Sequence, residues 1–80
     1  MKFTKYFEYT KLRPDRKDIK DEWIARAYFS PVFEVIQNDD RIRRWAKITE
    51  SDGKYLRIIV LEDLETIHNP FFDRTFKENL

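Results

Sequence analysis

The sequence has no cysteine, one glycine, three prolines and one histidine among its 80 residues. Without cysteine there is neither a disulfide framework nor a thiolate metal site, and one histidine alone does not make a zinc centre. We therefore expect no metal and no cofactor. No apolar run approaches the ~18 residues of a membrane span, and no signal-peptide core follows the first residues. A cytoplasmic protein without membrane contact is expected.

The scarcity of glycine and proline predicts short connections and one compact domain over residues 1–80. Aromatic residues are abundant, with seven Phe, four Tyr and two Trp, which suits a chain too short to bury more than about two thirds of its surface. Sixteen basic and fifteen acidic residues give a net charge of +1. A nucleic-acid site would therefore need a local basic patch.

Two conformations fit the aromatic N-terminal segment. Phe3, Tyr6 and Phe7 would share one face of a helix, whereas Phe3, Phe7 and Tyr9 would share one face of a strand. The threonines at positions 4 and 10 favour extended structure. We therefore expect a short strand over residues 3–10.

The main helix is expected after Arg13-Pro14, because the residue before a proline is pushed out of the α region. Asp18 or Asp15 would cap its N-terminus, and Ser30-Pro31 would end it. Its apolar positions recur at the spacing of one helical face: Ile19, Trp23, Ile24, Ala27 and Tyr28.

The rest of the chain predicts strands and turns. A short apolar segment at 33–37 precedes the turn Asn38-Asp39-Asp40, alternating strands cover 41–49 and 55–61, and a last strand over 65–69 ends at Asn69-Pro70. The predicted fold is α+β: a short N-terminal strand and one main helix packed on one face of a three- to four-stranded, mainly antiparallel sheet.

Loop lengths predict which strand residues face one another. A three-residue loop, Ser51-Asp52-Gly53, would pair Trp45 with Ile59. A two-residue turn at Asp63-Leu64 would pair Ile59 with His68. A one-residue change in either loop would turn a whole strand over.

Alternation along the strands divides the sheet into two faces. The face expected to receive the helix carries Ile42, Ala46, Ile48, Leu56, Ile58, Val60 and Ile67. The opposite face carries Arg43, Trp45, Lys47, Tyr55, Arg57, Ile59 and His68. Fixed cations suit phosphates and flat rings suit unstacked bases, so this second face is typical of single-stranded RNA binding.

We expect four residues to bind RNA: Arg43, Trp45, Tyr55 and Arg74. The alternative is an ordinary solvated face. In that case Phe71, Phe72 and Phe76 could fold back over Trp45 and Ile59.

His68 is the only side chain that titrates near neutral pH, so it is the candidate general acid or base. Arg57 and Lys47 would stabilise charge on a reacting phosphate. A structural role for the histidine is the competing interpretation. The Arg13-Pro14-Asp15-Arg16 loop is read as a solvated turn that could also bind phosphate.

The expected order of strand, helix and antiparallel strands resembles the RelE/ParE-type toxin superfamily and its small BrnT-like relatives. Tyr55-Leu56-Arg57 is similar to the arginine-bearing central strand of that family, with one residue interposed. Arg74 stands near the family's basic residue after the last strand, and Arg43 and Lys47 fit its basic residues on the preceding strand. Typical members have two helices after the first strand, and many carry a C-terminal tyrosine that this chain lacks.

The resemblance implies a toxin-like domain that binds RNA, with groups that could catalyse cleavage as a metal-independent endoribonuclease, and a cognate antitoxin protein that covers them. The alternative is a non-catalytic protein-interaction domain, in which the apolar residues of the second face bind a small partner protein or a second copy in a homodimer. A scaffold without present activity is a third interpretation.

Overall fold

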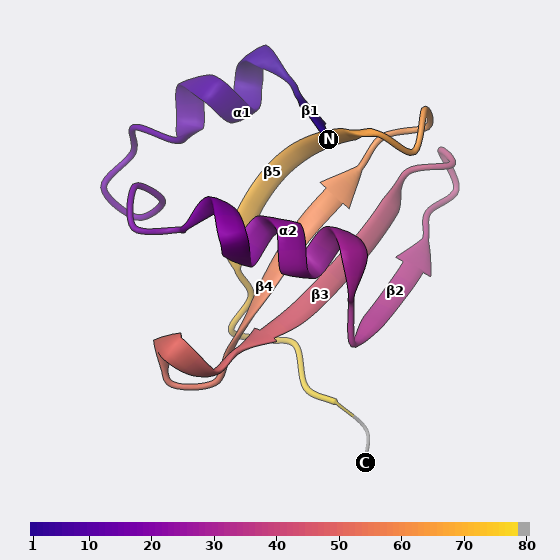
Figure 1. Ribbon diagram of the computed structural model, residues 1–80. Coiled ribbons are helices and arrows are strands. Elements are labelled where there is room, and N and C mark those ends of the chain that lie inside the picture. The colour runs from indigo at the N-terminus through magenta and orange to yellow at the C-terminus, as the bar shows by residue number, and fades with distance from the viewer. Residues whose placement is uncertain (79–80) are drawn as a thin grey trace.

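The computed structural model describes residues 1–78 and shows a five-stranded mixed sheet with two helices (Figure 1). Along the chain the elements are β1 (Lys2–Phe3), α1 (Lys5–Thr10), α2 (Asp21–Phe29), β2 (Phe33–Ile36), β3 (Ile42–Ile48), a 3-10 turn (Thr49–Ser51), β4 (Lys54–Val60) and β5 (Thr66–Phe72). The strand order is β1-β5-β4-β3-β2, with β1 parallel to β5 and the other neighbours antiparallel. The α+β class is confirmed. We expected three to four strands and one main helix, whereas the structure has five strands and two helices.

The N-terminal segment is a helix where we expected a strand. Only Lys2–Phe3 is extended, and α1 follows because Thr4 caps it: the Phe7 backbone N–H donates to Thr4 Oγ1 at 3.0 Å. Phe7 is buried at 2% exposure and stacks on Phe3. The helical face therefore outweighs the β-propensity of the threonines, and the prediction of a strand over residues 3–10 is wrong beyond Phe3.

The second helix, α2, is the main helix of the prediction. It ends at Phe29 with Ser30 as C-cap, as expected, but it begins at Asp21 after Lys20, whose side chain makes no capping bond. The expected caps at Asp18 and Asp15 are therefore wrong, because residues 11–18 form turns instead of a helix. Within residues 1–78, neither helix is long and apolar enough to cross a membrane.

The hydrophobic core lies between α2 and the predicted apolar face. All seven predicted residues of that face are buried, and so is the helical stripe apart from half-buried Tyr28: Ile42, Ala46, Ile48, Leu56, Ile58, Val60, Ile67, Ile19, Trp23, Ile24 and Ala27. Figure 1 shows α2 crossing this side of the sheet over β3 and β4. The opposite face of the sheet carries no helix, and we call it the helix-free face.

The β3–β4 hairpin has a longer loop than predicted, and its register is shifted. Trp45 faces Arg57 and Arg43 faces Ile59, a shift of two residues from the expected pairing of Trp45 with Ile59. The 3-10 turn Thr49–Ser51 lengthens the loop, and both Asp52 and Gly53 adopt positive φ. Because the shift is even, every side chain keeps its predicted face.

The last strand continues through the proline that was expected to end it. Asn69 adopts a positive φ of 53°, and the β4–β5 register shifts between Arg57 and Ile59. A bulge of this kind accommodates the missing amide of Pro70, so β5 resumes and runs to Phe72. The predicted pairing of Ile59 with His68 is confirmed.

Candidate nucleic-acid interface

The helix-free face presents its side chains in rows that cross the strands. One row runs from Arg43 through Ile59 to His68, and the next runs from Trp45 through Arg57 to Phe71. A third row pairs Lys47 with Tyr55. The register therefore places Arg57 at the centre of the face, with Arg43 diagonally beside it.

Arg57 lies against an aromatic ring and lacks an anionic partner. Its guanidinium carbon is 4.0 Å from the centroid of the Phe71 ring, in cation–π contact. Its Nε atom is buried without a hydrogen-bond partner. Burial, and then the charge of Arg43, lower the pKa of Arg57, while Asp73 acts weakly in the opposite direction. Burial and the neighbouring cation therefore both disfavour the charged form of Arg57.

Arg43 is held by a neutral side chain. With the Gln37 amide turned so that its oxygen faces the guanidinium, this oxygen accepts from Arg43 Nε and Nη2, both at 3.1 Å. The two residues line an open hollow of about 340 Å³ with Val35 and Trp45. None of the ion pairs within residues 1–78 includes Arg43 or Arg57. The two cations therefore stand together, near a hollow, with their charge unpaired.

The carboxy-terminal tail covers the neighbouring part of the face. Phe76 stacks on Trp45 with centroids 4.7 Å apart and meets Tyr55 edge-on, and Trp45 Nε1 donates to Asp73 Oδ2 at 3.0 Å. Trp45 is consequently only 6% exposed. The expectation that Trp45 presents a free ring for base stacking is wrong, because the tail already stacks on it. Tyr55 is half-buried beneath the same phenylalanine.

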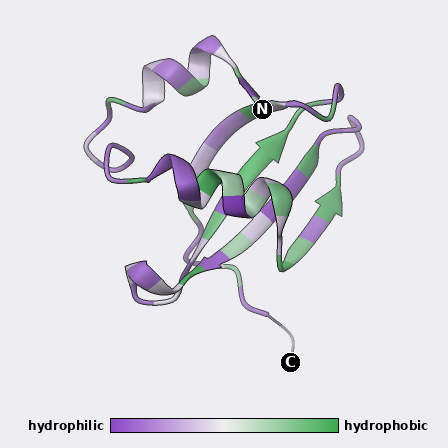
Figure 2. Ribbon diagram, in the orientation of Figure 1, coloured by the Kyte–Doolittle hydropathy of each residue, from purple (hydrophilic) through white to green (hydrophobic). Residues whose placement is uncertain are grey.

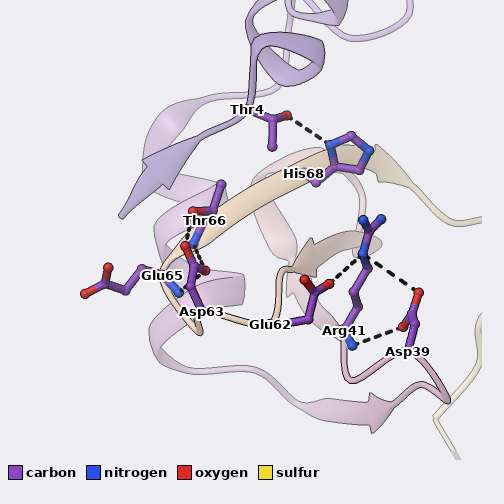
Figure 3. Close-up of polar contacts among 8 residues, drawn as sticks. All are labelled: Thr4, Asp39, Arg41, Glu62, Asp63, Glu65, Thr66 and His68. Atoms are coloured by element: carbon purple, nitrogen blue, oxygen red, sulfur yellow. Dashed lines mark hydrogen bonds and ion pairs between the residues drawn. The ribbon is translucent and has the colours of Figure 1, made fainter.

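His68 is tied to the start of α1. Its Nδ1 shares a 2.9 Å hydrogen bond with Thr4 Oγ1, and its ring lies 4.8 Å from that of Tyr6. Figure 3 shows the guanidinium of Arg41 close to the imidazole. Burial first, and the charge of Arg41 second, lower the pKa of His68. Both effects favour the neutral imidazole, and its hydrogen bond with Thr4 connects α1 to β5, which favours the structural interpretation.

The three predicted catalytic residues do not converge. Lys47 faces Tyr55 and His68 faces Ile59, so they lie at opposite ends of β4. At ~3.3 Å per residue, their positions differ by about 13 Å along the strand alone. Arg57 lies between them. One phosphate could not contact both ends, and the catalytic roles of Lys47 and His68 remain predictions.

Arg74 is exposed just after β5. It lines a groove of about 520 Å³ with Arg16 and Lys54, and two aspartates line the same groove: Asp15 and Asp18. The mixed charge of this groove favours no particular ligand. The RNA-binding role of Arg74 stays a prediction.

Sequence reasoning underestimated Arg16, which it placed in a solvated turn. Arg16 Nη1 donates to Asn69 Oδ1 at 2.7 Å, and its guanidinium lies 5.8 Å from the Phe71 ring. Its side chain is only 13% exposed. The ring of Phe71 therefore contacts two arginines, Arg16 and Arg57. The sequence did contain a signal, the Arg-Pro-Asp-Arg loop. Its contact with Asn69 of β5 could not be predicted, because the two segments are far apart along the chain.

Within residues 1–78 the structure brings no group of three or more metal-ligating side chains together. Scans of protein-family models, curated proteins and solved structures find no match to this chain. The RelE/ParE resemblance accordingly stays a prediction, and the function is argued from the site alone.

Proposed function

We propose that this protein binds single-stranded RNA through the helix-free face, with Arg57 and Arg43 as the phosphate-binding residues. One observation carries the proposal: the half-buried guanidinium of Arg57 has an unpartnered Nε and stands beside a second arginine with no ion pair to either. Burying a charge and a donor without partners costs stability. A bound phosphate would compensate the charge of both arginines, because guanidinium groups match phosphate oxygens with parallel N–H donors.

Apolar and aromatic neighbours favour a nucleic acid over a small anion. Ile59 lies between Arg43 and His68, and the Phe71 ring lies beside Arg57. Unstacked bases of a single strand need such surfaces, whereas inorganic phosphate does not. The net charge of +1 means that affinity would come from these local contacts and not from the field of the whole protein.

The toxin-like form of the proposal also includes cleavage of the RNA and a cognate antitoxin. Its support is the order of elements: two helices follow the first strand and precede antiparallel strands, which is the order that the RelE/ParE resemblance implies. Because Lys47 and His68 lie far apart, the arrangement supports RNA binding more directly than RNA cleavage.

Binding is tested by fluorescence anisotropy with a labelled single-stranded RNA of mixed sequence, for the wild type, Arg57→Met and a control. Arg26→Met is the matched control, because Arg26 lies on α2 and removal of its guanidinium changes the net charge equally. Arg57→Met should weaken binding and reduce the slope of log K against log salt by about 0.7, the value for one lost phosphate contact on a single strand. Equal losses in both variants would contradict the assignment.

Toxicity is tested by expression in a bacterial host. A growth defect that Arg57→Ala relieves, and that a neighbouring antitoxin gene suppresses, would support the toxin-like form. Growth unaffected by the wild type, or impaired equally by both forms, would remove that form and leave RNA binding to be judged by anisotropy.

A further inference from the structure

Strand β2 is an edge of the sheet and is apolar on both sides. All four of its residues are exposed, with Phe33 at 51%, Val35 at 40% and Ile36 at 66%. Phe29, at the end of α2, and Val32 extend this apolar strip at 69% and 47% exposure. Figure 2 shows β2 in hydrophobic colour apart from one hydrophilic band, which is Glu34. A long apolar edge is a surface that another strand can join.

The backbone of β2 leaves a defined set of groups unpaired. Gln37 N–H donates to the Arg41 carbonyl, and the register continues as Val35 with Arg43 and Phe33 with Trp45. Hydrogen-bonded pairs alternate in an antiparallel ladder, so the odd-numbered residues of β2 bond to β3. The N–H and C=O groups of Glu34 and Ile36 therefore point away from the sheet. Extended peptide groups of this kind are satisfied by a further strand.

We propose that β2 pairs in antiparallel fashion with β2 of a second copy of this chain, forming a ten-stranded sheet across a two-fold axis at Val35. The axis is perpendicular to the sheet, so each side chain keeps its face. Glu34 of each copy then faces Ile36 of the other copy. The symmetry makes two such pairs, and each pair makes two backbone hydrogen bonds. Val35 faces its own copy in the closely spaced, non-hydrogen-bonded pair between them.

Charge disfavours the neighbouring register that is centred on Glu34. A two-fold axis at Glu34 would place the two carboxylates directly opposite each other, and like charges in that position are destabilising. With the axis at Val35 each carboxylate keeps its ion pair with Arg44, 2.9 Å from Glu34 Oε2 to Arg44 Nε, on its own chain. The strand is thus self-complementary. Apolar residues lie at the centre of the pairing, and the unpaired backbone groups of β2 find partners on an identical strand.

The exposed area matches a dimer of modest affinity. If a phenylalanine presents about 200 Å² when fully exposed, Phe29 and Phe33 together present about 240 Å² on each chain. The three aliphatic residues bring the strip to roughly half the ~800 Å² per partner of a standard interface. We therefore expect reversible dimerisation at micromolar concentrations and above.

Pairing through β2 would place the two helix-free faces on the same side of the joined sheet. This dimer does not depend on RNA binding, and sedimentation without RNA tests it separately. Failure of the dimer would leave the Arg57 proposal standing, and the reverse also holds.

The test is sedimentation velocity of the full chain over about 5–500 μM, a range that brackets the expected dissociation constant. The matched variants are Ile36→Lys and Leu12→Lys, because Leu12 is also an exposed aliphatic residue, at 82%, far from β2 in sequence. The wild type and Leu12→Lys should shift from monomer to twice that mass as concentration rises. Ile36→Lys should raise the dissociation constant at least tenfold.

Hydrogen exchange of the unmodified protein supplies a readout that no variant can confound. The amides of Glu34 and Ile36 should become protected as concentration rises, while the amide of Leu12, which donates to the Tyr9 carbonyl of its own chain, should show no dependence on concentration. A wild type that stays monomeric at the highest concentration overturns the proposal. A dimer that leaves those two amides unprotected, or that Ile36→Lys does not weaken, overturns it as well.

Discussion

Replacing Arg57 by methionine should stabilise the fold while it removes RNA binding. Arg57 holds a buried Nε without a partner, and burial first, then the charge of neighbouring Arg43, lower the pKa of Arg57. Methionine has a similar length and no donor, so it can occupy the same position over Phe71. A residue kept for binding is expected to cost stability in the free protein, whereas a residue kept for structure is not.

The magnitude follows from three contributions. Removing the unsatisfied buried donor gains about 1–3 kcal/mol. Losing the cation–π contact with Phe71, 4.0 Å from guanidinium carbon to ring centroid, costs about 0.5–2 kcal/mol. A methionine–aromatic contact returns about 0.3–1.5 kcal/mol. At the middle of each range the net gain is about 1.5 kcal/mol, which for a domain of this size raises the midpoint of thermal unfolding by about 6–12 °C.

Thermal unfolding followed by circular dichroism at low ionic strength measures this shift, with Arg26→Met as the charge control. Arg26 is exposed and bonded to Glu50, so its replacement should leave the midpoint unchanged or slightly lower. A midpoint for Arg57→Met several degrees below that of the wild type would refute the reasoning. Arg57 would then be a packing residue whose contact with Phe71 outweighs its unpaired donor.

Two further predictions concern the edges of the same face. Phe76→Ala should shift tryptophan emission to longer wavelength and cost about 1–2 kcal/mol in urea unfolding, because the ring that stacks on Trp45 is lost; unchanged emission would show that Phe76 does not cover the indole. Because burial and Arg41 lower the pKa of His68, the unfolded chain binds that proton more readily than the folded one, so stability should fall as pH drops below about 6.5. His68→Asn should flatten the thermal midpoint between about pH 7.5 and 5.5; an equally steep profile would contradict this.

The fold could be predicted from the sequence wherever burial of one face makes apolar residues recur at a regular spacing. The alternation in 41–49 and 55–61 gave both faces correctly, and an even register error left them intact. Local hydrogen bonds were harder to foresee. Thr4 looked like a strand residue and is a helix cap, and Asn69 looked like a terminator and is a bulge. In each case one side chain or one dihedral angle outweighed the propensity of its segment.

The candidate site was predictable in its cations and not in its contacts. Alternation placed Arg43 and Arg57 on one face, as the structure has them. The alternation left open whether Trp45 is exposed or covered by Phe76, and only the packing of the chain after β5 decides for the cover. Arg16 reaches Asn69 for the same reason, through tertiary packing that no local spacing reveals.

The side-chain Nε–Hε signal of Arg57 in a nitrogen–proton correlation spectrum tests the phosphate contact most directly. The free protein should show this buried N–H without a hydrogen-bond acceptor, and titration with single-stranded RNA should shift the signal as a phosphate binds the guanidinium to which it belongs. The signal of Arg26 should stay in place. An Arg57 signal that remains fixed while RNA binds would mean that the nucleic acid lies elsewhere on the protein.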